Sequence, residues 1–147
     1  MDSENLSQII VDFNSTLLDF VNNIAAICPD SIIGANAKDI CKAIDKPANE
    51  RKFIEVFVGC VLIYKPQIDA GDDNFFLNKS YDEDLQNGQA TLNKNFEINS
   101  KSDNMINKVF EFKTIWGKLN RTNKDIVIQY MKLLCELAQQ YFEIYVR

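Results

Sequence analysis

Acidic side chains crowd one short stretch of the sequence, and carboxylates at such density can bind calcium. Residues 69–84 carry six acidic residues and one lysine: Asp69, Asp72, Asp73, Asp82, Glu83, Asp84 and Lys79. A calcium loop of the EF-hand type needs oxygen ligands at alternate positions, a central glycine and a terminal glutamate. Counting from Asp69 or Asp72 places Phe, Leu or Ser at ligand positions. The spacing therefore favours a solvated acidic surface, or an acidic face for a basic partner, over a metal site.

Other groups that could perform catalysis are sparse. The chain has no histidine, which removes the usual general base and the commonest transition-metal ligand. Glu55 and Glu111 are flanked by dense apolar sequence, but each can equally project from the outer face of a helix. Nucleophile-elbow, phosphate-binding glycine-loop and lysine-based motifs are absent from the sequence. We therefore predict a protein that is not an enzyme and has no cofactor or metal.

The cysteines and the first residues indicate a reducing compartment. Cysteines occur at positions 28, 41, 60 and 135, without Cys-x-x-Cys spacing and each within or beside apolar sequence. This pattern is typical of buried, reduced thiols. The first eight residues, MDSENLSQ, are polar and acidic and do not resemble a signal peptide. We expect an intracellular protein that is not secreted.

The overall charge argues against nucleic-acid binding. Net charge is −5 and the pI is about 4.7, the wrong sign for a general nucleic-acid binder. The last third of the chain has a mild basic bias, from Lys113, Lys118, Arg121, Lys124 and Lys132. Because Glu111, Asp125 and Glu136 interleave with these charges, we expect them to complement acidic residues or face solvent.

The periodicity of apolar residues predicts an all-α fold, a single-domain helical bundle spanning residues 1–147. Four main helices are expected, at 3–28, 48–64, 102–117 and 122–146. Short helices are expected near 36–45 and 81–85, and a long polar loop at about 72–101. The final pair of helices should be antiparallel because a short connection joins them.

The most apolar segment is residues 53–64, FIEVFVGCVLIY. A buried strand is the alternative, because valine, isoleucine and aromatic residues are abundant. The helix-forming residues before it and the spacing of its apolar residues by three and four favour a buried helix. A membrane span needs about 20 apolar residues, and Lys52 and Glu55 interrupt this segment. We therefore expect no membrane insertion.

One candidate interaction patch combines aromatic rings with the acidic stretch. Its residues are Asp72, Asp73, Phe75, Phe76, Tyr81, Asp82, Glu83 and Asp84. If Phe75 and Phe76 are exposed, the patch can bind a partner or a second copy. The alternative is that Phe75, Phe76 and Leu77 fold back to cover the core.

Residues 112–138, FKTIWGKLNRTNKDIVIQYMKLLCELA, resemble a pattern in small proteins of giant and other nucleocytoplasmic large DNA viruses. The shared form is Lys-x-x-Trp-x-x-Leu, then Asn-Lys, then an apolar helix with tyrosine and paired leucines. Residues 53–64, followed by acidic residues and Phe75-Phe76-Leu77, are similar to the same group. The family has no established activity, so no functional residues carry over from it. Our first hypothesis is a non-enzymatic viral helical protein that acts by protein–protein interaction, as a virion component, scaffold or replication-compartment factor. On this hypothesis the protein is located in the host cytoplasm or the virion. Its partner is another protein or a second copy, since a symmetric homodimer is the commonest use of such a surface.

A second resemblance gives the alternative function. Trp116-Gly117 resembles the Trp-Gly that opens the central helix of Bcl-2-like proteins, whose buried helix is ringed by amphipathic ones. The order differs, because the most apolar segment here comes about 50 residues earlier, and Lys118 stands where that family has arginine. The resemblance implies an apoptosis regulator that binds an amphipathic peptide helix.

Overall fold

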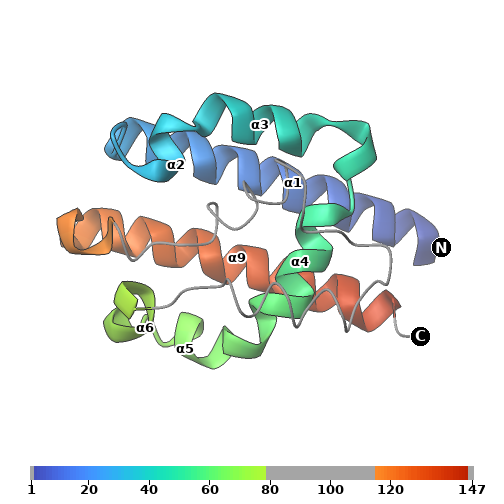
Figure 1. The fold of residues 1–147 in the computed structure, drawn as a ribbon. Helices are drawn as coiled ribbons and strands as arrows, with labels where there is room; N and C mark the ends of the chain where they lie inside the picture. The colour runs from blue at the N-terminus through green and yellow to red at the C-terminus, as the bar shows by residue number, and fades with distance from the viewer. Residues whose placement is uncertain (1, 79–114, 146–147) are drawn as a thin grey trace.

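The computed structural model describes residues 2–78 and 115–145, and within these residues the chain is helical with no strand, which confirms the predicted all-α class (Figure 1). The elements, in chain order, are α1 (Asp2–Ile27), α2 (Ile32–Ala35), α3 (Ala37–Asp45), η1 (Pro47–Asn49), α4 (Lys52–Cys60), η2 (Leu62–Tyr64), α5 (Lys65–Asp69), α6 (Asp73–Asn78), η3 (Trp116–Lys118) and α9 (Arg121–Tyr145). No helix in this part of the chain is long and apolar enough to cross a bilayer.

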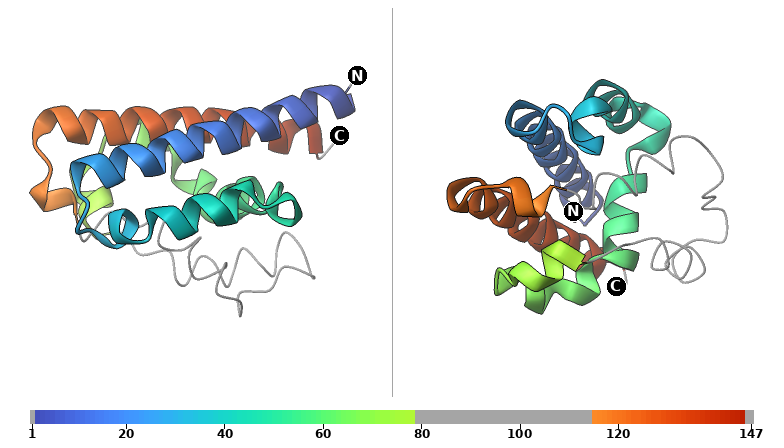
Figure 2. Two further views of the ribbon diagram at one scale, coloured as in Figure 1. Left: turned by 90° about the horizontal axis from the view of Figure 1, so that it is seen from above. Right: turned by 60° about the vertical axis from the view of Figure 1, so that its left-hand side comes forward.

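The two long helices, α1 and α9, form an antiparallel pair that spans the molecule (Figures 1 and 2). The start of α1 and the end of α9 lie at the same end of this pair. α2 and α3 pack along α1, α5 packs against α9 on the opposite side, and α4 crosses from one side to the other while contacting both long helices. The first and last described helices therefore make the centre of the fold.

The core forms because the long helices each bury one stripe of apolar residues spaced by three and four. On α1 the stripe is Ile9, Ile10, Phe13, Leu17, Phe20, Val21 and Ile24; on α9 it is Val127, Ile128, Met131, Leu134, Cys135, Ala138 and Tyr141. α4 inserts Phe57 edge-on against Phe13, with ring centroids 5.4 Å apart. The predicted helices at 3–28, 36–45 and 122–146 correspond to α1, α3 and α9.

The predicted helix at 48–64 is interrupted. η1 precedes α4, which ends at Cys60, and Val61 (φ −112°, ψ −37°) leads into the tighter η2 turn. Burial also weakens after this point: Val61 is fully buried, Leu62 and Tyr64 are partly buried, and Ile63 is 73% exposed. The prediction of one buried helix over residues 53–64 is therefore right as far as Cys60 and wrong beyond it. Pro66 lies in the first turn of α5, where a proline is tolerated because its position needs no N–H donor.

The polar loop predicted at about 72–101 begins instead with a helix, α6. Asp72 stabilises its start, since the Oδ1 atom accepts hydrogen bonds from the backbone N–H groups of Asn74 (3.0 Å) and Phe75 (3.3 Å). The predicted short helix at 81–85 and most of the predicted helix at 102–117 lie outside the described residues. The end of the latter, around Trp116, is the single 3-10 turn η3.

Candidate functional site

The aspartates of the predicted interaction patch that the structure describes make contacts within the chain. Besides the Asp72 cap, the Asp73 Oδ2 atom lies 3.5 Å from Nη1 of Arg121, which ties α6 to the start of α9. Tyr81, Asp82, Glu83 and Asp84 lie outside the described residues. The two described aspartates of the patch therefore have intramolecular roles that the sequence pattern did not distinguish from a partner-binding role.

Phe76 belongs to the core. It is 1% exposed and stacks on Trp116 with ring centroids 4.6 Å apart and an interplanar angle of 18°. Phe75 is half-buried, edge-on to Phe76 at 5.3 Å and tilted against Tyr64 at 5.4 Å. The prediction that Phe76 is exposed for contact is wrong, and the alternative of rings folded back over the core holds for this residue. The physical reason is its stack with Trp116, which lies 40 positions later in the chain.

One basic side chain lies over the Trp116 ring, and another lies at the start of α9. Lys124 Nζ lies 5.5 Å from the centroid of the Trp116 ring, within the range of a cation–π contact. The Nε and Nη2 atoms of Arg121 donate to Oδ1 of Asp125 at 3.0 and 2.7 Å, and these bonds raise the pKa of the guanidinium. The basic bias of this segment is therefore partly satisfied by contacts within the chain, as the interleaved carboxylates predicted.

Glu55 is the described carboxylate with a perturbed environment. It lies half-buried on α4, where desolvation raises its pKa and the charge of Arg51 opposes the shift. Tyr141 on α9 is 2% exposed; burial, together with the charge of Glu55, raises its pKa to about 12. Its hydroxyl lies near Glu55 and Arg51, but it makes no hydrogen bond of standard length and angle within the described part of the chain. A phenol with this pKa stays protonated at neutral pH, so it can donate a hydrogen bond but cannot act as a nucleophile.

Two of the cysteines, Cys41 and Cys135, are also poorly suited to nucleophilic chemistry. Burial raises the pKa of Cys135 to about 12, and burial with the charge of Asp45 raises the pKa of Cys41. The thiolate is the reactive form, so both thiols remain unreactive at neutral pH. Among residues 2–78 and 115–145, no group of three or more His, Cys, Asp or Glu side chains could hold a metal ion.

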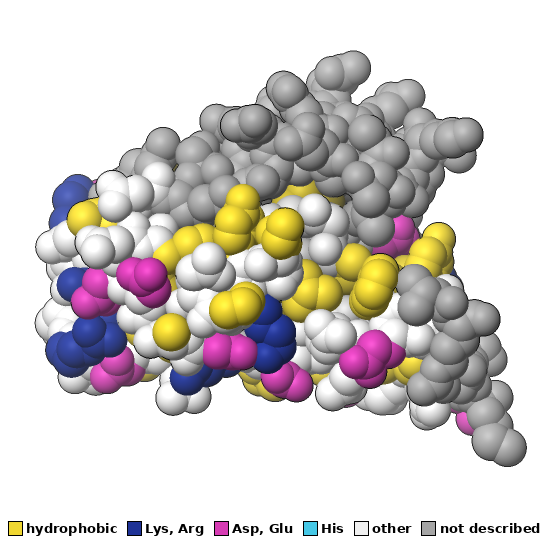
Figure 3. All heavy atoms as spheres, turned by 90° about the horizontal axis from the view of Figure 1, so that it is seen from below, with side chains coloured by type: hydrophobic (Ala, Val, Ile, Leu, Met, Phe, Trp, Pro, Cys, Tyr) yellow, Lys and Arg dark blue, Asp and Glu magenta, His cyan; other side chains and the backbone are white. Residues whose placement is uncertain are grey.

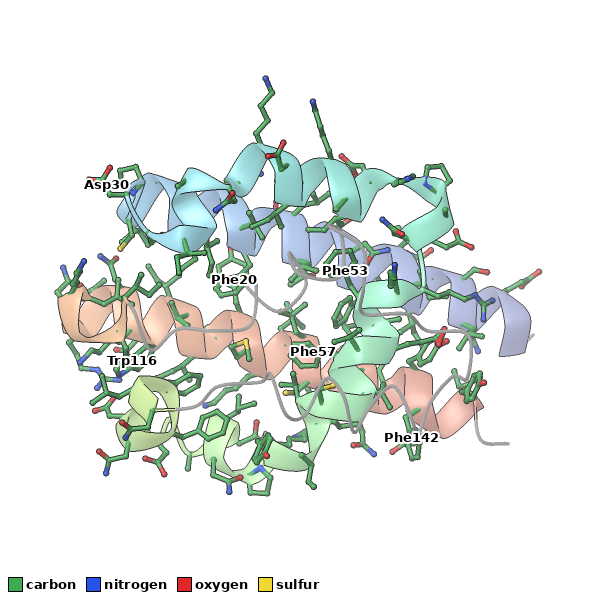
Figure 4. The ribbon with its side chains drawn as sticks, in the orientation of Figure 1. Phe20, Asp30, Phe53, Phe57, Trp116 and Phe142 are labelled. Atoms are coloured by element: carbon green, nitrogen blue, oxygen red, sulfur yellow. The ribbon has the colours of Figure 1, made fainter. Side chains whose placement is uncertain are left out.

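An exposed apolar surface lies where the stripe of α9 continues beyond the core. Phe142 is 39% exposed and Tyr145 is 56% exposed, although each lies four residues after a buried stripe residue, Ala138 and Tyr141. Figure 4 shows Phe142 projecting from the last part of α9, on the side away from α1. The 3-10 turn η2 contacts α9 and carries the exposed Ile63. We call Ile63, Phe142 and Tyr145 the η2–α9 surface.

Figure 3 shows apolar side chains gathered on the face that carries α5 and α9. Lys65 joins these two helices, with its Nζ atom 2.6 Å from Asp69 Oδ2 and 3.0 Å from Glu136 Oε1. Sequence reasoning missed this surface. The signal that could have found it is the length of the apolar stripe, which continues to Tyr145 at the end of α9.

A groove of about 380 Å³ lies on another side of the same end of α9, against the first half of α1. Its lining residues are Asn5, Gln8, Ile9, Asp12, Gln140, Glu143 and Ile144. We call it the α1–α9 groove. Amides and carboxylates dominate the lining, unlike the apolar groove that a Bcl-2-like protein needs to bind a peptide helix.

Comparison of the chain with protein-family models, with curated proteins and with solved structures gave no match.

Proposed function

We propose that this is a non-enzymatic helical protein that acts by protein–protein contact, and that the η2–α9 surface binds a second copy of the chain. The observation that carries the proposal is the exposure of three large apolar side chains, Ile63 (73%), Phe142 (39%) and Tyr145 (56%), on η2 and the last turns of α9, two elements that contact each other. Large apolar side chains that adjoin on a surface are typical of contact sites.

A two-fold symmetric contact suits a small surface of this kind. In such a dimer the same residues of both copies form the interface, so every contact between two different residues occurs twice in the complex. Aromatic side chains contribute most to such contacts because they bury large area with few rotatable bonds. The stacked rings of Tyr141 and Tyr145, with centroids 5.8 Å apart, hold Tyr145 in place before contact and reduce the entropy lost on binding.

The viral resemblance motivates the biological setting that we propose, a virion component, scaffold or replication-compartment factor in the host cytoplasm or virion. The alternative function, a Bcl-2-like apoptosis regulator, gains no support from the described groove, because its lining is polar.

The oligomeric state tests the proposal. Light scattering coupled to size-exclusion chromatography, over a series of protein concentrations, is expected to show a dimer for the unaltered chain and a monomer for Ile63→Ser/Phe142→Ser. Val11→Ser/Ile32→Ser is the matched control, because these residues are 56% and 44% exposed but lie on α1 and α2. Circular dichroism checks that each variant is folded. A monomeric unaltered chain, or equal dissociation of the two double variants, would contradict the proposal.

A further inference from the structure

The α1–α9 groove has two carboxylates held in place by neighbouring amides. Gln8 Nε2 donates to Oδ1 of Asp12 at 2.8 Å, and Gln139 Nε2 donates to Oε1 of Glu143 at 3.0 Å. Each donor is four residues before its acceptor on the same helix. A neutral amide restrains the carboxylate without cancelling its charge, and it leaves the second oxygen free to accept another donor.

No cation on either helix lies close enough in sequence to neutralise these carboxylates. α1 contains no lysine or arginine, and α9 contains none after Lys132. The ion pairs of Lys65 and Arg121 are made with other carboxylates, those of Asp69, Glu136, Asp73 and Asp125. At the facing ends of α1 and α9, neither helix supplies a cation to offset these carboxylates.

The floor of the groove is apolar. Ile9 is 8% exposed and Ile144 is partly buried against the core. A lysine or arginine side chain combines an aliphatic stem with a charged, donor-rich tip. Such a side chain can lay its stem on the isoleucines while its tip meets the carboxylates and the amide oxygens at the rim.

We propose that the α1–α9 groove binds lysine or arginine side chains presented by a partner protein. Its volume of about 380 Å³ is near the lower end of the range of ligand sites, a size that suits one or two side chains rather than a large cofactor. The sequence indicated residues 69–84 as an acidic face for a basic partner. The groove is a second candidate for such a face, between the paired ends of the two long helices. This inference is independent of the proposed dimer, because Ile63, Phe142 and Tyr145 do not line the groove.

Nuclear magnetic resonance tests the inference with a defined probe. The ¹⁵N-labelled full chain is titrated with the capped peptide acetyl-Lys-Gly-Lys-amide, with acetyl-Gln-Gly-Gln-amide as the uncharged comparison. We expect the lysine peptide to shift backbone signals of residues 5–12 and 140–144, and the glutamine peptide to leave them unchanged. Asp12→Asn/Glu143→Gln should raise the Kd of the lysine peptide about tenfold, since each exposed ion pair contributes a few-fold to affinity.

The matched control is Asp19→Asn/Asp30→Asn, which removes two exposed carboxylates outside the groove and changes the net charge equally. Asp30 lies at the opposite end of α1, beyond its last residue (Figure 4). The inference predicts an unchanged Kd for this control. Equal weakening by both double variants would show general electrostatic attraction, and absence of shifts in the groove would show no site; either outcome overturns the inference. Spermidine that shifts the same signals when the lysine peptide does not would identify a free polyamine site and overturn the assignment to a protein partner.

Discussion

Phe76→Ala is expected to destabilise the protein strongly, because the ring is core rather than contact surface. The side chain is 1% exposed and stacks on Trp116 at 4.6 Å, so its removal loses both the transfer free energy of the ring and the aromatic contact. Truncation of a buried phenylalanine costs about 3 kcal/mol or more of unfolding free energy. With a urea dependence of about 2 kcal/mol per molar, the midpoint of urea unfolding should fall by about 1.5 M.

Tryptophan fluorescence is the natural assay, because Trp116 is the single tryptophan of the chain and one face of its ring contacts the altered residue. Phe75→Ala serves as the comparison: its ring is half-buried, so its loss should cost about 1 kcal/mol. Circular dichroism in the same titration checks that unfolding is global. An unchanged midpoint and unchanged native fluorescence for Phe76→Ala would refute the packing argument. A folded Phe76→Ala variant that lost self-association would return Phe76 to the contact surface.

Two further predictions concern backbone space and pH. Gly34→Ala should lower the unfolding free energy by about 2 kcal/mol, because the added Cβ would lie 2.2 Å from the carbonyl oxygen of Cys28. Gly117→Ala is the control in the same urea titration. It should be nearly neutral, because no atom lies within 4 Å of its added Cβ. Burial raises the pKa of Glu55 in the folded protein. Above this pKa the carboxylate is ionised in a partly desolvated site, which lowers the free energy of unfolding. The loss disappears as the pH falls below the unfolded-state pKa of about 4, where Glu55 is protonated in both states. Glu55→Gln should therefore raise the urea midpoint at neutral pH and leave it unchanged at about pH 3; a lower midpoint at neutral pH would contradict this assignment.

The two long helices were predictable because their apolar residues repeat at a spacing of three and four over many turns. The stripe of α1 repeats over seven buried residues from Ile9 to Ile24, and α9 repeats over a similar length, so single ambiguous positions do not change the prediction. The segment around α4 lacks this redundancy. Residues 53–64 are apolar on nearly every side, so their pattern does not indicate where burial ends. Only the packed structure shows that the helix stops at Cys60 and that Ile63 faces outward.

The candidate site was less predictable because its roles depend on distant contacts. Phe76 lies in a polar, acidic stretch, and the sequence pattern cannot show that a ring 40 positions away covers it. Asp72 and Asp73 are acidic whether they cap a helix, pair with Arg121 or face a partner, so composition alone does not separate these roles. The exposed end of α9 has the same apolar spacing as its buried part. The difference arises from what packs beside it.

The central pairing of α1 with α9 has a consequence for how the chain acquires its structure. The hydrogen bond from Asn23 Nδ2 to Tyr130 Oη, 2.6 Å long, joins residues 107 positions apart. Closing so large a loop costs entropy before any of its contacts form, which slows folding compared with helical bundles whose neighbours in space are neighbours in sequence. During synthesis the apolar stripe of α1 emerges from the ribosome long before α9 exists. Until translation reaches the last helix, the elements that α1 contacts in the fold and that already exist are α2, α3 and α4.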